Sequence, residues 1–159
     1  VSGARLTAKG IDRVEFLISP NRGEQARPLR KIASGGELSR SMLAIKRVLA
    51  GLRPTGLYVF DEVDSGVGGG VAEVIGRKLK DVAKHHQVLC ITHLPQIAVF
   101  ADAHYLVEKA VKDGRTQSDV RRLSEKERGE EIARMLGGLK ITKKTRDAAA
   151  EMLRSAHDA

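Results

Sequence analysis

Several residue types are scarce in this chain of 159 residues. It has no tryptophan, only 3% aromatic residues, and a single cysteine, Cys90, in the apolar run from Val88 to Ile91. A disulfide framework is therefore excluded, and one cysteine among apolar neighbours is typical of a small core residue in a reducing compartment. With so few aromatic residues, the core must be built from Leu, Ile, Val, Ala and Met.

Long hydrophobic runs and targeting segments are also absent. No apolar run approaches the roughly 20 residues that a membrane-spanning helix needs, and residues 1–9 contain no apolar stretch of a signal peptide. Hydrophobic residues nevertheless make up 42% of the chain, which is a globular composition. We expect one cytoplasmic domain over residues 1–159 with no membrane partner. Because the sequence opens without Met, we expect it to be part of a longer protein.

The net charge of +8 is unevenly distributed. Basic residues predominate in segments 1–53 and 109–146, whereas acidic residues predominate in segment 54–108. The basic segments can meet a polyanion such as DNA or a nucleotide, or they can form an ordinary solvated surface. Charge alone does not separate these alternatives.

The periodicity of apolar residues predicts an α/β fold with a mainly parallel sheet flanked by helices. The predicted strands are 13–19, 57–60, 87–92, 105–109 and 119–123, the last two being edge strands joined around Asp113-Gly114. The predicted helices are 36–51, 71–82, a short one opened by His93-Leu94-Pro95, 124–138 and 142–156. Strand 57–60 is a short apolar run, and strand 87–92 contains the apolar run 88–91, which is typical of strands buried on both faces.

The two longer helices in the first half of the chain have apolar residues at helical spacing. The residues expected on their buried faces are Leu38, Met42, Ile45 and Leu49 in the first helix, and Val71, Val74, Ile75, Leu79 and Val82 in the second.

The segment Ala33-Ser34-Gly35-Gly36-Glu37 precedes the first predicted helix. Its glycines let the backbone approach a ligand closely, and the unpaired N–H groups and dipole of a helix start attract an anion. The Ser34 hydroxyl can add a further donor. A Ser-Gly-Gly triplet alone is weak evidence for such a site, because a capped turn that binds nothing has the same sequence.

Asp61 and Glu62 follow the predicted buried strand 57–60. Ligands of open α/β sheets collect at the carboxyl ends of strands, where adjacent carboxylates are costly without a partner. Asp61 is expected to bind Mg²⁺, directly or through water. Because side chains alternate along a strand, Glu62 is expected to point elsewhere, toward a water that attacks a phosphate. The alternative is a pair of solvated loop acids.

His93 follows the second predicted buried strand, 87–92, and is expected to lie beside Asp61 and Glu62. From there it can donate a hydrogen bond to a phosphate oxygen. The other histidines lack this placement and are predicted to be surface residues: His85, His86, His104 and His157. No His and Cys residues have the spacing of a zinc site.

In this order and spacing, the three sites resemble those of ABC-type ATPases. Segment 33–37 resembles the signature motif with Ala in place of the usual Leu, 57–62 the Walker B strand, 63–69 the D-loop, and His93 the switch histidine. Several longer stretches resemble the RecN family of SMC-like bacterial DNA repair proteins: 14–17, 33–40, 61–69, 91–98 and 131–138.

This resemblance implies the C-terminal lobe of an ABC/SMC-type ATPase head that uses ATP and Mg²⁺, acts in double-strand break repair and recombination, and associates with the bacterial nucleoid. In such heads, ATP is held between two heads of a homodimer. The residues implied to contact the nucleotide of the second head are Ser34, Gly35, Gly36 and Glu37. Asp61, Glu62 and His93 would act on the nucleotide of their own head.

The family also implies a dimer interface and a DNA surface. Asp64, in the D-loop, would lie at the interface between heads. The candidate DNA-binding groups are Lys140, Lys143, Lys144, Arg146 and the hairpin 110–122.

One motif of such heads is missing. No G-x-x-x-x-G-K-[ST] occurs in the 159 residues, and no lysine follows Gly66 to Gly70. The β- and γ-phosphates would lose their main cradle, so the chain by itself is predicted to bind ATP weakly and not to hydrolyse it. We expect the N-terminal, Walker A half of the head to supply this loop, from the same or another molecule.

Two alternatives stay open. The chain can be the nucleotide-binding domain of an ABC transporter, although Leu94-Pro95-Gln96 argues against this. It can also belong to a clamp in which ATP holds DNA and hydrolysis only resets the state.

Overall fold

The computed structural model describes residues 8, 10–12, 14–19, 22–31, 34–49, 56–112, 115–138 and 140–157. Four predicted features lie outside these residues: the strand start at Arg13, the signature residue Ala33, the helix end at Gly51 and the turn Asp113-Gly114. Within the described ranges, no helix has both the length and the apolar character needed to cross a membrane.

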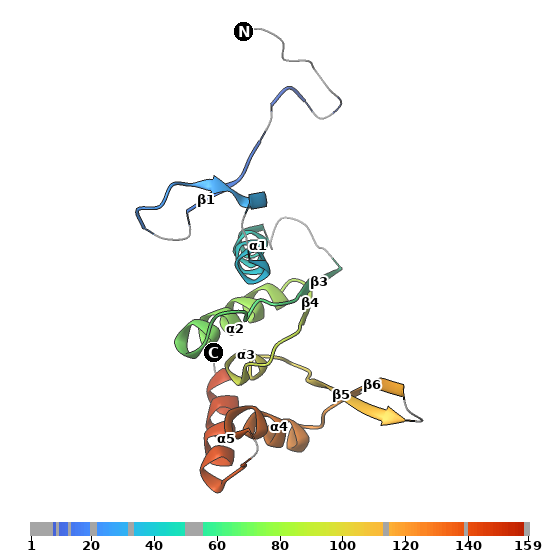
Figure 1. The fold of residues 1–159 in the computed structure, drawn as a ribbon. Coiled ribbons are helices and arrows are strands. Elements are labelled where there is room, and N and C mark those ends of the chain that lie inside the picture. Colours follow the sequence, from blue (N-terminus) through green and yellow to red (C-terminus); the bar gives the residue numbers. More distant parts are fainter. Residues whose placement is uncertain are drawn as a thin grey trace.

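The chain alternates strands and helices, as the sequence predicted (Figure 1). Its elements are β1 (Leu17–Ile18), β2 (Arg27–Pro28), the 3-10 helix η1 (Leu29–Lys31), α1 (Gly35–Leu49), β3 (Leu57–Phe60), α2 (Gly69–Ala83), β4 (Gln87–Cys90), α3 (Pro95–Ala98), β5 (Tyr105–Lys112), β6 (Arg115–Arg122), α4 (Glu125–Gly137) and α5 (Lys143–His157). The α/β fold class is confirmed.

The predicted mainly parallel sheet is only partly borne out, because among the described strands parallel pairing is confined to β3 and β4, where Leu57 lies opposite Gln87 and Phe60 opposite Cys90. The other described strands form antiparallel pairs, β1 with β2 and β5 with β6, so each described sheet has two strands. The predicted strand 13–19 is reduced to Leu17–Ile18. Its partner β2 is equally short and includes Pro28, which cannot donate to a ladder.

The prediction that β3 and β4 are buried on both faces is wrong. Phe60 is buried, but Leu57 and Val59 are 48% and 57% exposed, and Leu89 of β4 is 47% exposed. Side chains alternate along a strand, and α2 contributes its buried residues to the core on the Phe60 side only. On the opposite face of the pair, these apolar side chains stay about half exposed among the described residues.

Helix α3 joins two hydrophobic cores. The first combines buried residues of α1, β3, α2 and α3: Leu43, Phe60, Val63, Ala72, Ile75, Leu79, Val82 and Ile97. The second lies between α3, α4 and α5: Ala98, Val99, Phe100, Ile132, Ala133, Ala149 and Ala156. Cys90 packs against the first core, as predicted, and burial raises the pKa of its thiol to about 12.

The buried faces of α1 and α2 agree only in part with the predicted ones: Ile75, Leu79 and Val82 of α2 are buried as predicted. Leu38, Leu49, Val71 and Val74 are exposed, whereas Leu43 and Ala72 are buried. The difference arises because each helix is covered on one narrow side only, centred on Leu43 in α1 and on Ala72, Ile75 and Leu79 in α2.

The predicted helix caps in the C-terminal part are confirmed. Ser124 and Glu127 form a reciprocal capping box at the start of α4, and hydrogen bonds from Ser124 and Arg121 lower the pKa of Glu127 to about 2. Gly138 ends α4 with a φ of 61°. Thr142 accepts a hydrogen bond of 3.2 Å from the Thr145 N–H at the start of α5.

Candidate functional site

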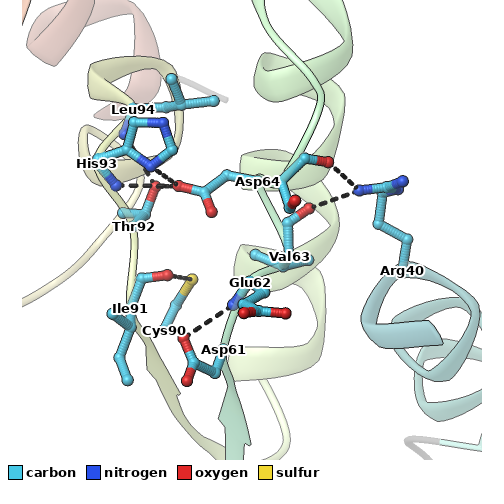
Figure 2. A network of polar contacts seen from close by, with 11 residues as sticks. Arg40, Asp61, Glu62, Val63, Asp64, Cys90, Ile91, Thr92, His93 and Leu94 are labelled. Atoms are coloured by element: carbon cyan, nitrogen blue, oxygen red, sulfur yellow. Dashed lines mark hydrogen bonds and ion pairs between the residues drawn. The ribbon is translucent and has the colours of Figure 1, made fainter. Parts of the chain in front are cut away.

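The carboxyl ends of β3 and β4 lie side by side because the two strands are parallel. The pairing continues past β4, where the Ile91 N–H donates to the Phe60 carbonyl at 3.0 Å. Asp61 and Glu62 follow β3, and Thr92 and His93 follow β4, so these four residues share one edge (Figure 2). We call them the strand-end edge. The structure thus brings together the predicted Asp61, Glu62 and His93.

A tight turn separates the two carboxylates. Glu62 has a φ of 57°, which is unusual for a residue with a side chain and costs about 1–3 kcal/mol. Its N–H donates to Asp61 Oδ1 at 2.9 Å, and its carbonyl accepts from the Ser65 N–H at 3.0 Å. The predicted strand alternation therefore does not apply, because β3 ends at Phe60 and a left-handed turn directs the two side chains.

The glycines at the start of α1 let that helix approach this turn. A Cβ built on Gly35 would overlap Glu62 Oε2, and one built on Gly36 would lie 2.8 Å from Ser65 Cβ and 3.0 Å from the Glu62 carbonyl oxygen. Ser34 Oγ accepts from the Glu37 N–H at 3.1 Å, which makes it a helix cap. The helix start and the Glu62 carboxylate are therefore neighbours within one chain.

Two residues of α1 that the sequence reasoning missed bind the same turn. Ser39 Oγ donates to the Asp61 carbonyl at 2.7 Å. Arg40 Nη1 donates to the Ser65 carbonyl at 2.8 Å and to the Val63 carbonyl at 3.4 Å (Figure 2). Their position inside the family-like stretch 33–40 was the available signal.

Asp64 is the buried acid of the turn, with 5% of its surface exposed. Its Oδ2 atom accepts from Thr92 Oγ1 at 2.6 Å and from the His93 N–H at 2.9 Å, and lies 3.0 Å from His93 Nδ1. Burial alone would raise the pKa of Asp64, but these hydrogen bonds bring it below its usual value. The predicted contact of Asp64 with a second head stays a prediction, since its carboxylate is bonded inside the chain.

Asp61 presents an exposed carboxylate at this edge, and its binding of a metal ion stays a prediction. Within the part of the chain that the structure describes, no three His, Cys, Asp or Glu side chains converge as a metal site. One exposed carboxylate fits Mg²⁺, which is usually held by one or two carboxylates together with phosphate oxygens and waters.

The predicted DNA-binding residues lie away from the strand-end edge, Lys140, Lys143, Lys144 and Arg146 around the start of α5 and the hairpin 110–122 in β5 and β6 (Figure 1). Lys140, Lys143 and Lys144 are exposed. Arg146 Nε lies 3.0 Å from Glu130 Oε1, so its charge is already paired.

The prediction that the remaining histidines lie on the surface is wrong for two of them. His86 is buried against Tyr58, with ring centroids 4.9 Å apart. His104 is half-buried, and burial lowers its pKa. His85 and His157 are exposed, as predicted.

No family model matches the chain. The chain is 54% identical over 144 residues to the DNA repair protein RecN of Xylella fastidiosa (strain 9a5c), covering 91% of this chain and 26% of that protein. It is 50% identical over 152 residues to the DNA repair protein RecN of Bacillus subtilis (strain 168), covering 96% of this chain and 26% of that protein. It thus spans about a quarter of the length of the curated relatives it matches.

One solved structure, from work on ATP-driven dimerization and DNA-stimulated activation of SMC ATPases, resembles this chain with a TM-score of 0.49 and 21% sequence identity. The match covers 74% of this chain and 70% of the chain in that structure. A likeness at that level assigns nothing by itself. The sequence matches are much stronger, and they relate this chain to the C-terminal portion of the RecN DNA repair proteins.

Proposed function

We propose that this chain supplies the signature, metal, base and switch groups of an SMC-like ATP-hydrolysing head that acts in DNA double-strand break repair and recombination. The observation that carries the proposal is the strand-end edge, where two parallel strands present Asp61, Glu62 and His93 together. The sequence kinship with RecN repair proteins supports the same assignment.

Each group has a role that follows from its chemistry. Asp61 would hold Mg²⁺, which when bound neutralises charge on the phosphates. Glu62 accepts a proton from the attacking water, and the exposed His93 ring contacts a phosphate oxygen. A Walker A half supplies the phosphate cradle, and we call this chain joined to that half the complete head. The chain by itself remains predicted to be inactive.

The start of α1 would serve the second head of a homodimer. Its exposed N-terminal end, at Ser34 and Gly35, offers N–H groups and a positive dipole end to the γ-phosphate held by the other head. Glu37, in the first turn of α1, is the last residue of this proposed nucleotide-binding segment. The site is then formed only when two heads associate, which couples nucleotide binding to dimerisation.

DNA contact and location are also part of the proposal. Lys140, Lys143 and Lys144 offer an exposed basic group at the start of α5, and Arg146, paired with Glu130, contributes less. The hairpin 110–122 is a second candidate surface. We place the complete protein in the bacterial cytoplasm, associated with the nucleoid.

Mixing two inactive variants of the complete head tests this division of labour. Ser34→Arg blocks the signature, and Glu62→Gln removes the base. In a mixed dimer, the site on the Ser34→Arg head has an intact Glu62 and an intact signature from its partner. After random subunit exchange, half of the dimers are mixed and each has one working site, so ATP hydrolysis should recover to about a quarter of the wild-type rate.

The control mixes each variant with itself, which should give no recovery. If the mixture of the two variants also stays inactive while gel filtration shows exchanged dimers, then signature and base do not belong to different heads, and this part of the proposal fails.

A further inference from the structure

Asp64 has no chemical step in the function proposed above, yet it is buried and its Oδ2 atom contacts Thr92 and His93. We infer that Asp64 is a positioning residue, whose Oδ2 atom fixes the ring orientation and the tautomer of His93 so that Nε2 faces the nucleotide. The inference rests on the proposed function, because it specifies how one residue of that site is held.

The contacts of the carboxylate define the state of the ring. A carboxylate only accepts hydrogen bonds, so His93 Nδ1 at 3.0 Å from Oδ2 must carry a proton. In the neutral ring, Nε2 is then the unprotonated nitrogen, so it donates to a phosphate oxygen only when the ring takes up a second proton. The His93 side chain is 76% exposed, so the nitrogen that Asp64 does not hold is open to a ligand.

The same oxygen also fixes the backbone from which the ring projects. Oδ2 accepts from the His93 N–H at 2.9 Å and from Thr92 Oγ1 at 2.6 Å. Thr92 Oγ1 in turn accepts from the Leu94 N–H at 3.1 Å. One oxygen atom of Asp64 therefore contacts both the ring and the backbone N–H of His93. These two contacts restrict rotation of the side chain.

Asp64 itself is held from the opposite side. Arg40 of α1 donates to the carbonyls of Val63 and Ser65, the residues on either side of Asp64 in the sequence (Figure 2). Val63 is completely buried in the first core. The backbone that carries Asp64 is thus anchored by a core residue and by Arg40, as partners that orient a functional histidine are usually held in turn.

A double-mutant cycle in the complete head tests the inference. Asp64→Ala should lower kcat for ATP hydrolysis by about 10- to 100-fold with little change in KM, because the ring is no longer held for the transition state. In a His93→Ala background, the same substitution should lower kcat by less than about threefold. Asp64→Asn keeps an oxygen toward the three donors and should retain more of the rate than Asp64→Ala.

A second readout does not depend on activity. With ¹⁵N-labelled histidine, the His93 signal, identified by its loss in His93→Ala, should show Nδ1 protonated in the wild type. In Asp64→Ala it should shift toward the tautomer with the proton on Nε2. Asp102→Asn, a change at an exposed aspartate of an ion pair with Lys80, is the matched control and should alter neither measurement.

Different outcomes overturn different claims. An equal loss from Asp64→Ala with and without His93, or an unchanged His93 tautomer, overturns the positioning role and leaves the proposed function standing. Normal hydrolysis by His93→Ala, or none by the wild-type complete head, overturns the proposed function and this inference with it.

Discussion

Replacing Glu62 with Gln in the complete head is expected to lower ATP hydrolysis by about 10²- to 10⁴-fold and to leave ATP binding intact. Gln has nearly the same shape as Glu but cannot accept the proton of the attacking water. Its side chain can keep the place beside Gly35 that Glu62 occupies. Steady-state hydrolysis and a nucleotide-binding titration on the same preparation measure the two effects separately.

Glu73→Gln is the matched control, since Glu73 is an exposed residue of α2 paired with Arg77. It should hydrolyse ATP at the wild-type rate. If Glu62→Gln does the same, Glu62 is not the base, and the strand-end edge would need another group to activate water.

Replacing Gly36 with Ala is expected to lower the free energy of unfolding by about 1–3 kcal/mol, even though Ala favours helices. The added methyl group would lie 2.8 Å from Ser65 Cβ and 3.0 Å from the Glu62 carbonyl oxygen. Backbone cannot move aside as a flexible side chain can, so α1 must shift away from the turn. Chemical denaturation of the complete head measures this loss.

Alanine substitutions at two further glycines serve as controls for the change in the free energy of unfolding. Gly129 lies in α4 with open space where its Cβ would be, so Gly129→Ala should stabilise by about 0.4–1 kcal/mol. Gly35→Ala would meet only the flexible end of the Glu62 side chain and should cost less than Gly36→Ala. If Gly36→Ala proves as harmless as Gly129→Ala, then α1 is not packed against the turn as described.

The predictions that the structure confirms were based on patterns of residues close together in the sequence. The apolar runs before Asp61 and before Thr92 predicted two neighbouring parallel strands, and this was enough to place His93 beside the two acids. The capping box at Ser124 and the hairpin of β5 and β6 were equally local, since they depend on residues close in sequence.

Features that depend on contacts between residues far apart in the chain could not be predicted from the sequence. Whether a strand is covered on one face or two depends on what packs against it, so the exposure of Leu57 and Val59 was not predictable from their apolar character. The left-handed turn at Glu62 and the engagement of Asp64 with Thr92 and His93 likewise arise from tertiary contacts.

The most direct test of a shared nucleotide site is a structure of the complete head carrying Glu62→Gln, solved with ATP and Mg²⁺. We expect Mg²⁺ to be bound by Asp61, directly or through one water, and His93 Nε2 to contact the γ-phosphate while Nδ1 stays on Asp64. Ser34 of the second head should contact the same γ-phosphate. A nucleotide bound away from Asp61 and His93 would contradict the assignment of the strand-end edge.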